Sequence, residues 1–192
     1  MGIRILIVED EFILAKNLQK FAELLGHTVL AITDDGSKAM EQADSLHPEL
    51  VLMDIKLKGL DGISAARNIT REKRIPVILI TAYSDRQFVE KAAEAGVMTY
   101  LIKPVSTGDL QAAIDITMAR NREMQALRHQ VGDLQLSLAH RKIIDRAKGY
   151  LMDNLHLTEA DAFRRLQQQS QRENRPMTDI AQAVVTTFSL GE

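Results

Sequence analysis

The sequence predicts an α/β fold over residues 1–120, followed by a long helix and a small three-helix all-α module. Five short apolar runs alternate with helical patterns in the first part, and this alternation predicts a doubly wound parallel sheet. Residues 139–190 instead show three helical patterns in a row. The length of 192 residues suits one domain plus a small module, because a domain takes roughly 150 residues.

The five apolar runs have the length and composition of buried parallel strands. They span residues 3–8, 28–32, 50–53, 76–80 and 98–102. Several are apolar throughout, which is typical of strands covered on both faces. An amphipathic helix follows the first run, with Phe12, Ala15, Leu18, Phe21 or Ala22, and Leu25 on its apolar side. The right-handed crossover rule then places helices on both faces of the sheet.

Polar side chains stand where four of these runs end. They are Glu9 and Asp10, Asp54, Thr81, and Lys103. A lone acid after a strand is usually a helix cap, but three acids at one sheet edge repel one another unless a cation binds them or their pKa values rise. Oxygen ligands without cysteine or histidine favour Mg²⁺. A carboxylate beside Mg²⁺, with a lysine and a hydroxyl nearby, is suited to accepting a phosphoryl group.

Residues 1–120 resemble the receiver domain of two-component response regulators. The resemblance rests on residues 5–11 (ILIVEDE), 50–54 (LVLMD), 60–62 (LDG), 80–82 (ITA) and 100–104 (YLIKP). It implies a flavodoxin-like doubly wound sheet of five parallel strands. It also implies that Asp54 is the phosphoacceptor and that Glu9 and Asp10 are the acid pair of a Mg²⁺ site. Asp10, Asp54 and the backbone carbonyl of Lys56 would hold the ion.

The resemblance implies further roles around the acceptor. Thr81 and Lys103 would contact the phosphoryl oxygens, Tyr100 would be the switch aromatic, and the peptide bond before Pro104 would be cis. Receivers that never accept phosphate usually lack an acid or the lysine, whereas this set is complete. One departure is Lys58, which stands where many receivers carry proline, so the lifetime of the phosphoryl group is open.

A coiled-coil helix is expected to connect the two parts over residues 121–138. No proline lies between Pro104 and Pro176. Apolar residues recur there at spacings of three and four, forming a short heptad seam of Met124, Leu127, Val131, Leu134 and Leu138, with Arg141 at the next position. So long an apolar stripe favours a parallel dimer, and the alternative is a helix that packs on its own receiver domain.

Three helices are predicted across residues 139–192. The first carries Ile143, Ile144, Ala147, Leu151 and Leu155 on its apolar side. A capping box at residues 158–161 begins the second, which continues with Phe163 and Leu166. Thr178 is the candidate cap of the third, with Ile180, Val184 and Phe188 along one face. Phe163 and Phe188 are expected in the core.

This segment resembles the ANTAR module, a three-helix RNA-binding output domain of transcription antitermination regulators. The resemblance rests on residues 146–152 (RAKGYLM), 157–166 (LTEADAFRRL) and 177–181 (MTDIA). It implies that the partner is an RNA hairpin loop, commonly one of a pair near a transcription terminator.

The charges of the segment agree with an RNA partner. Eight Lys/Arg and five Asp/Glu lie between Arg141 and Arg175, although the whole chain has a net charge of -2. Arginine suits phosphates and base edges, and tyrosine can stack on a base. The expected RNA contacts are Lys142, Arg146, Lys148, Gly149, Tyr150, Arg164, Arg165 and Arg172. The alternative is that these side chains form a solvated face.

Composition narrows the other possibilities. Without cysteine there are no disulfides, no thiolate nucleophile and no Cys-ligated zinc. No apolar stretch approaches the roughly 18 residues of a membrane span, and no signal peptide is recognised, so a cytoplasmic protein without a membrane partner is expected. An enzymatic output is not expected, because residues 121–192 show no glycine-rich phosphate loop and no metal-ligand spacing. DNA is not the expected partner either, since no recognition-helix pattern is clear. A protein partner stays open.

Together these features predict a phosphorylation-dependent response regulator. A histidine kinase would supply the phosphoryl group to Asp54, and the added charge would shift an existing equilibrium between two states. The favoured state would pair two chains, so that two output modules grip RNA hairpins together and prevent a terminator from forming.

Overall fold

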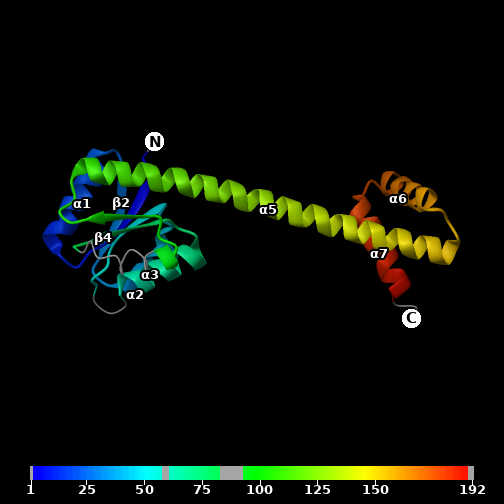
Figure 1. Ribbon diagram of the computed structural model, residues 1–192, viewed down its shortest axis with the longest axis horizontal. Helices are drawn as coiled ribbons and strands as arrows, with labels where there is room; N and C mark the ends of the chain where they lie inside the picture. Colours follow the sequence, from blue (N-terminus) through cyan, green and yellow to red (C-terminus); the bar gives the residue numbers. More distant parts are fainter. Residues whose placement is uncertain (1, 58–60, 83–92, 190–192) are drawn as a thin grey trace. The chain divides into compact units, whose positions relative to one another are not determined.

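The computed structural model describes residues 2–57, 61–82 and 93–189 (Figure 1). By its internal contacts the chain divides into two compact units, Met1–Met124 and Gln125–Glu192. Each unit has its own hydrophobic core. Lys58 and residues 83–92 lie outside the described residues.

The first unit is built on a five-stranded parallel sheet. Its strands are β1 (Arg4–Val8), β2 (Thr28–Thr33), β3 (Leu50–Asp54), β4 (Val77–Thr81) and β5 (Thr99–Ile102). They are ordered β2-β1-β3-β4-β5, and every neighbouring pair is parallel. This confirms the predicted flavodoxin-like sheet. The register pairs Asp54 with Ile80 and Thr81 with Ile102, so the carboxyl ends of β3, β4 and β5 meet at one edge.

Helices cover both faces of the sheet because alternate side chains of the central strands point to opposite sides. One core joins Leu6, Val51 and Met53 to α2 (Gly36–Leu46) and α3 (Gly62–Asn68). The other joins the alternate residues of the same strands to α1 (Phe12–Leu24) and to the start of α5 (Thr107–Leu155). A π-helical turn, η1 (Ile69–Lys73), continues α3.

Helix α1 buries fewer residues of its apolar side than the sequence predicted. Ala15, Leu18 and Ala22 are buried, as expected. Phe12 was expected on the same side but is 73% exposed, and Ile13 beside it is also exposed. Phe12 is the first residue of the helix, so its side chain lies beyond the part of α1 that packs on the sheet.

The start of α3 is held tightly against the end of β3. Asp61 caps the helix by accepting hydrogen bonds from the backbone N–H groups of Ile63 and Ser64 at 3.1 and 3.0 Å. Although burial alone would raise the pKa of Asp61, these bonds and the Ser64 hydroxyl hold that pKa below its ordinary value. A Cβ on Gly62 would lie 2.0 Å from the backbone oxygen of Asp54. Only glycine permits this approach.

The second unit packs the end of α5 against α6 (Glu159–Glu173) and α7 (Met177–Ser189). Its core is small and consists of Ala147, Leu151, Ala162, Leu166, Ile180, Ala181 and Val185. The predicted cap at Thr158 is confirmed, since its side chain accepts the backbone N–H of Asp161. Three predictions are wrong. Thr178 lies inside α7, which begins at Met177, and Phe163 and Leu155 are 41% and 43% exposed.

Gly62→Ala is expected to destabilise the first unit, because the added Cβ would clash with the backbone of Asp54, which is held in β3. Overpacking of this kind costs about 1–3 kcal/mol. Gly108→Ala is the matched control in the same unit, since a Cβ there meets only Ser106 Oγ at 3.8 Å. Urea unfolding followed by circular dichroism compares the two. Equal stability of both variants would contradict the tight junction between β3 and α3.

Candidate functional site

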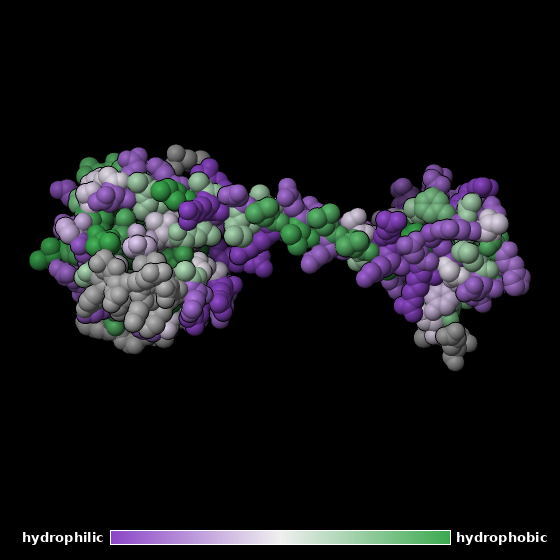
Figure 2. All heavy atoms as spheres, in the orientation of Figure 1, coloured by the Kyte–Doolittle hydropathy of each residue, from purple (hydrophilic) through white to green (hydrophobic). Residues whose placement is uncertain are grey.

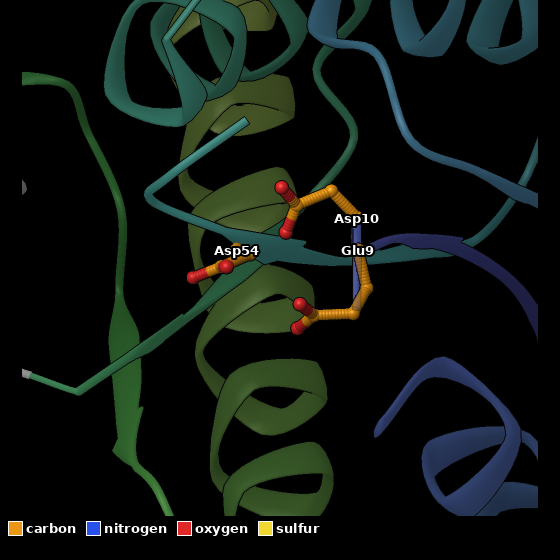
Figure 3. A group of neighbouring side chains, drawn as sticks. All are labelled: Glu9, Asp10 and Asp54. Atoms are coloured by element: carbon orange, nitrogen blue, oxygen red, sulfur yellow. The ribbon is translucent and has the colours of Figure 1, made fainter. Parts of the chain in front are cut away.

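Three carboxylates meet at the carboxyl edge of the sheet (Figure 3). Glu9 and Asp10 follow β1, and Asp54 ends β3. Each offers one oxygen, and these oxygens all lie within 4.8 Å of one another. Glu9 is 3% exposed and Asp54 is also buried, whereas Asp10 is open to solvent. The structure thus brings together the acids that the sequence placed at this edge.

Lys103 offsets much of this negative charge. Its ammonium Nζ lies 3.1 Å from Asp54 Oδ2 and 3.0 Å from Glu9 Oε2. Burial by itself lowers the pKa of Lys103, but hydrogen bonds to Asp54 and Glu9 and their charges raise it above its ordinary value. The lysine therefore stays charged and bridges two of the three acids.

Glu9 has a strongly raised pKa. Burial and the charge of Asp54 raise its pKa to about 7, although Lys103 and the backbone N–H of Glu11 act in the opposite direction. Its Oε2 accepts no hydrogen bond of good geometry from the described residues. A buried carboxylate oxygen of this kind, beside two further carboxylates, offers the ligands that a hard divalent cation such as Mg²⁺ prefers.

The other predicted receiver residues lie around this cluster. Thr81 ends β4 and is buried, and its carbonyl accepts the backbone N–H of Lys103 at 2.8 Å. The Lys103–Pro104 peptide bond is cis, as predicted. Tyr100 lies on β5 with 41% of its surface exposed. Lys56 follows β3 and is exposed.

Sequence reasoning missed two positioning residues of this site. Asp61 caps α3 and Gly62 lets the start of that helix approach the Asp54 backbone. The Asp61-Gly62 pair itself was the available signal, since aspartate before a helix start is a common cap. Their part in holding the start of α3 against the Asp54 backbone depends on a close contact that no residue pattern predicts.

Some of the predicted RNA-contacting side chains form no ion pair with the described residues, whereas others already bind acids of the protein. Lys142, Arg165 and Arg172 are exposed, and no ion pair involves them among the described residues. Lys148 is largely buried and bridges Asp145 and Glu159 at 2.7 and 2.8 Å. The hydrogen bonds that the Lys148 ammonium donates to Asp145 and Glu159 raise its pKa, and the bond to Glu159 ties α5 to the start of α6.

The remaining predicted contacts lie on α5 and α6. The Tyr150 ring stacks on Phe188 with centroids 5.9 Å apart, and the Arg146 guanidinium lies 5.9 Å from the Tyr150 ring. Arg164 lies 3.4 Å from Asp161. Nothing lies within 4 Å of a Cβ built on Gly149. The surface near Gly149 is therefore open.

The matches to known protein families fall one in each of the two units. Residues 5–115 match the response regulator receiver domain, and residues 132–185 match the ANTAR domain. The transcriptional regulatory protein PdtaR of Mycobacterium tuberculosis is 38% identical over 185 residues, which is 96% of this chain and 90% of PdtaR. The DNA-binding response regulator MtrA of Mycolicibacterium smegmatis is 31% identical over 140 residues, covering 73% of this chain and 61% of MtrA.

Solved receiver domains share the fold of the first unit. The receiver domain of a modulated diguanylate cyclase from Desulfovibrio desulfuricans aligns with a TM-score of 0.61 and 32% identity, over 65% of this chain and 99% of its own. The receiver domain of the sensor histidine kinase PA1611 from Pseudomonas aeruginosa aligns with a TM-score of 0.56 and 31% identity, over 62% and 99%. That structure has a magnesium ion coordinated in its active site cleft.

The pKa of Glu9 is expected to shift in opposite directions in two variants. Asp54→Asn removes a charge that raises it, so the pKa should fall below about 7. Lys103→Met removes a partner that lowers it, so the pKa should rise further. Carbon-13 NMR of the Glu9 carboxyl during a pH titration, without divalent cations, measures both. Shifts in the same direction would contradict the charge balance described above.

The same shift predicts how stability depends on pH. Because the folded pKa of Glu9 lies above its unfolded value of 4.5, the folded chain binds more protons than the unfolded chain between pH 4.5 and about 7. The contribution of Glu9 to stability should therefore fall as pH rises through this window, in the absence of a bound cation. Urea unfolding of the wild type and Glu9→Gln across this range isolates the contribution.

Proposed function

Because this chain belongs to the response regulators and combines a receiver domain with an ANTAR domain, we propose that phosphorylation of Asp54 controls its binding to RNA hairpins and causes transcription antitermination. The chain is a regulator and not an enzyme. The observation that carries the proposal is the buried Asp54 carboxylate, beside two more acids and 3.1 Å from Lys103.

Asp54 is the proposed phosphoacceptor. Its carboxylate oxygen forms a bond to phosphorus while the phosphorus–nitrogen bond of a phosphohistidine breaks, and the histidine nitrogen leaves with the electron pair. The donor is therefore a histidine kinase. Mg²⁺ bound by Glu9, Asp10, Asp54 and the Lys56 carbonyl would neutralise charge on the transferring oxygens. Lys103 stays charged at neutral pH and binds a phosphoryl oxygen in addition to the acids.

Thr81 and Tyr100 form the proposed switch. Phosphorylation adds about −1.5 to −2 charges at Asp54. Thr81 ends the neighbouring strand, so a small movement brings its hydroxyl to the phosphoryl group. Tyr100 is partly exposed on β5 and can turn inward to fill the space that Thr81 leaves. The repacked β4–β5 face then favours one of two states of the chain.

RNA is the proposed partner of the output module. We propose the following bounds for the three parts of the chain. The receiver domain takes residues 1–120, the coiled-coil linker 121–138 and the RNA-binding domain 139–192. The exposed or partly exposed groups that suit phosphates and unpaired bases include Lys142, Arg146, Tyr150, Arg164, Arg165 and Arg172. Among the described residues, no helix has both the length and the hydropathy for crossing a membrane. We propose a cytoplasmic location because the chain belongs to the response regulators.

Helix α5 provides the proposed dimer interface. Its apolar seam is exposed, with Leu134 at 65%, and Figure 2 shows hydrophobic residues along this part of the helix. Taking Met124 as heptad position a puts Val131 at a, with Leu127 and Leu134 at d, a combination that favours two-stranded parallel coiled coils. The same register places Glu123 at g and Arg128 at the following e position, where opposite charges attract between parallel chains.

RNA binding should depend on phosphorylation of Asp54. The full chain is titrated with a two-hairpin RNA, with and without Mg²⁺ and a phosphoryl mimic, while light scattering records mass. Tighter binding together with doubled mass is expected, because two linked modules gain avidity. Asp54→Asn should bind RNA equally with and without the mimic. Duplex DNA of equal length serves as the nucleic-acid control.

Two results would contradict this account. Asp54→Asn that still responds to the mimic would show that another group is the acceptor. Absence of RNA binding by an activated wild type would overturn the output assignment and favour a protein partner.

The charge pair of the coiled coil gives a separate test. Arg128→Glu should weaken dimerisation of the activated chain, because it sets two acids against each other in a parallel pair. Adding Glu123→Lys should restore dimerisation by reversing the pair. Analytical ultracentrifugation measures both variants. Failure of the double variant to recover would argue against the parallel register.

A further inference from the structure

A groove lies within the second unit, between α6 and α7. It encloses about 380 Å³, within the range of roughly 300–1,000 Å³ typical of ligand pockets. Its apolar lining includes Leu151, Leu166, Ile180, Val184 and Phe188. Leu151, Leu166 and Ile180 are nearly fully buried and belong to the core, so the floor of the groove is rigid.

The rim of the groove is polar and carries two arginines. Arg165 and Gln169 reach it from α6, Arg175 follows that helix, and Thr187 reaches it from α7. Glu173 is the acid of the rim, and it is occupied by Arg175 at 3.3 Å and by the side-chain amide of Gln169. Arg165 has no ion-pair partner among the described residues. The rim therefore has an unpaired guanidinium available for an anion.

We propose that this groove receives a single unpaired nucleobase of an RNA hairpin loop. The inference rests on the proposed RNA-binding function and names the subsite within it. A base needs an apolar slot for its faces, polar groups for its edge, and a cation for the adjoining phosphate. The groove offers all three. Val184 and Phe188 line the slot, the side-chain oxygens of Gln169 and Thr187 can accept hydrogen bonds from the base edge, and Arg165 suits the phosphate.

An aromatic stack forms one wall of the slot. Phe188 lines the groove and also stacks on Tyr150, with an angle of 14° between the rings. Arg146 lies 5.9 Å from the centre of the Tyr150 ring. The contact with Tyr150 therefore positions the Phe188 ring before any ligand enters the groove. A preformed wall reduces the ordering cost of binding, and aromatic side chains are common stacking platforms for unpaired bases.

The charges of the rim favour a nucleotide over an apolar peptide as the occupant. A peptide of apolar side chains would cover the slot but would leave the Arg165 guanidinium without a partner and partly desolvated, which is costly. A nucleotide brings its own phosphate to that position. Arginine forms paired hydrogen bonds with phosphate in its planar geometry.

Ala183→Met tests the groove with a side chain that fills it. Ala183 lines the groove but is exposed, so the longer side chain occupies the slot without entering the core. Gln167→Met is the matched control, because Gln167 is exposed on α6 and outside the groove lining. The full activated chain is titrated with a pool of RNA stem-loops whose loops are randomised. Affinity should fall by about tenfold or more in Ala183→Met and stay unchanged in the control.

A second measurement separates blocked binding from misfolding. Methyl NMR of Ile180 and Val184 in the wild type should show shifts on addition of nucleoside monophosphates, and Ala183→Met should retain a folded methyl spectrum without these shifts. If the wild type binds the RNA pool and Ala183→Met binds it equally well, the groove is not the subsite and the proposed function stands. If the activated wild type binds no RNA in the pool, both the function and the subsite are wrong.

Discussion

The ammonium group of Lys103 holds together a site that would otherwise repel itself. Two buried carboxylates, Glu9 and Asp54, lie within about 3 Å of its Nζ, and the exposed Asp10 completes the acid group. The balance is incomplete, because the pKa of Glu9 remains raised to about 7. An acid cluster with residual negative charge favours binding of a divalent cation, and the Lys103 ammonium already lies within reach of charge that is added at Asp54.

The sheet fixes where this charge balance is made. Strands buried on both faces leave little freedom of register, because a shift by one residue would turn core side chains toward the wrong layer. The ends of β1, β3, β4 and β5 consequently deliver acids, a hydroxyl and a lysine to one edge. Gly62 and Asp61 add the local constraint behind Asp54. The proposed change of charge at Asp54 would therefore meet neighbours that the sheet holds in place, whereas Tyr100 lies on the outermost strand and is 41% exposed.

The strands, the sheet and the acid site could be predicted from sequence because each depends on a local pattern. Apolar runs define strands whose observed ends differ from the expected ones by at most one residue, and the residues that follow these strands must meet at the sheet edge. The wrong predictions concern which apolar side chains of a helix are buried. Phe12 and Phe163 are apolar yet exposed, and periodicity does not tell how far a partner layer extends. Lys148 forms ion pairs with acids on two helices. Because the pair with Glu159 depends on how α5 and α6 pack, it could not be predicted from the sequence pattern.

Intact-mass spectrometry of the full chain after incubation with a small-molecule acyl phosphate shows whether Asp54 accepts a phosphoryl group. The wild type should gain one phosphoryl group only when Mg²⁺ is present, and Asp54→Asn should gain none under the same conditions. Lys103→Met should also remain unmodified or react far more slowly, because it lacks the cation that meets the incoming oxygens. Equal modification of Asp54→Asn and the wild type would contradict the assignment of Asp54 as the acceptor.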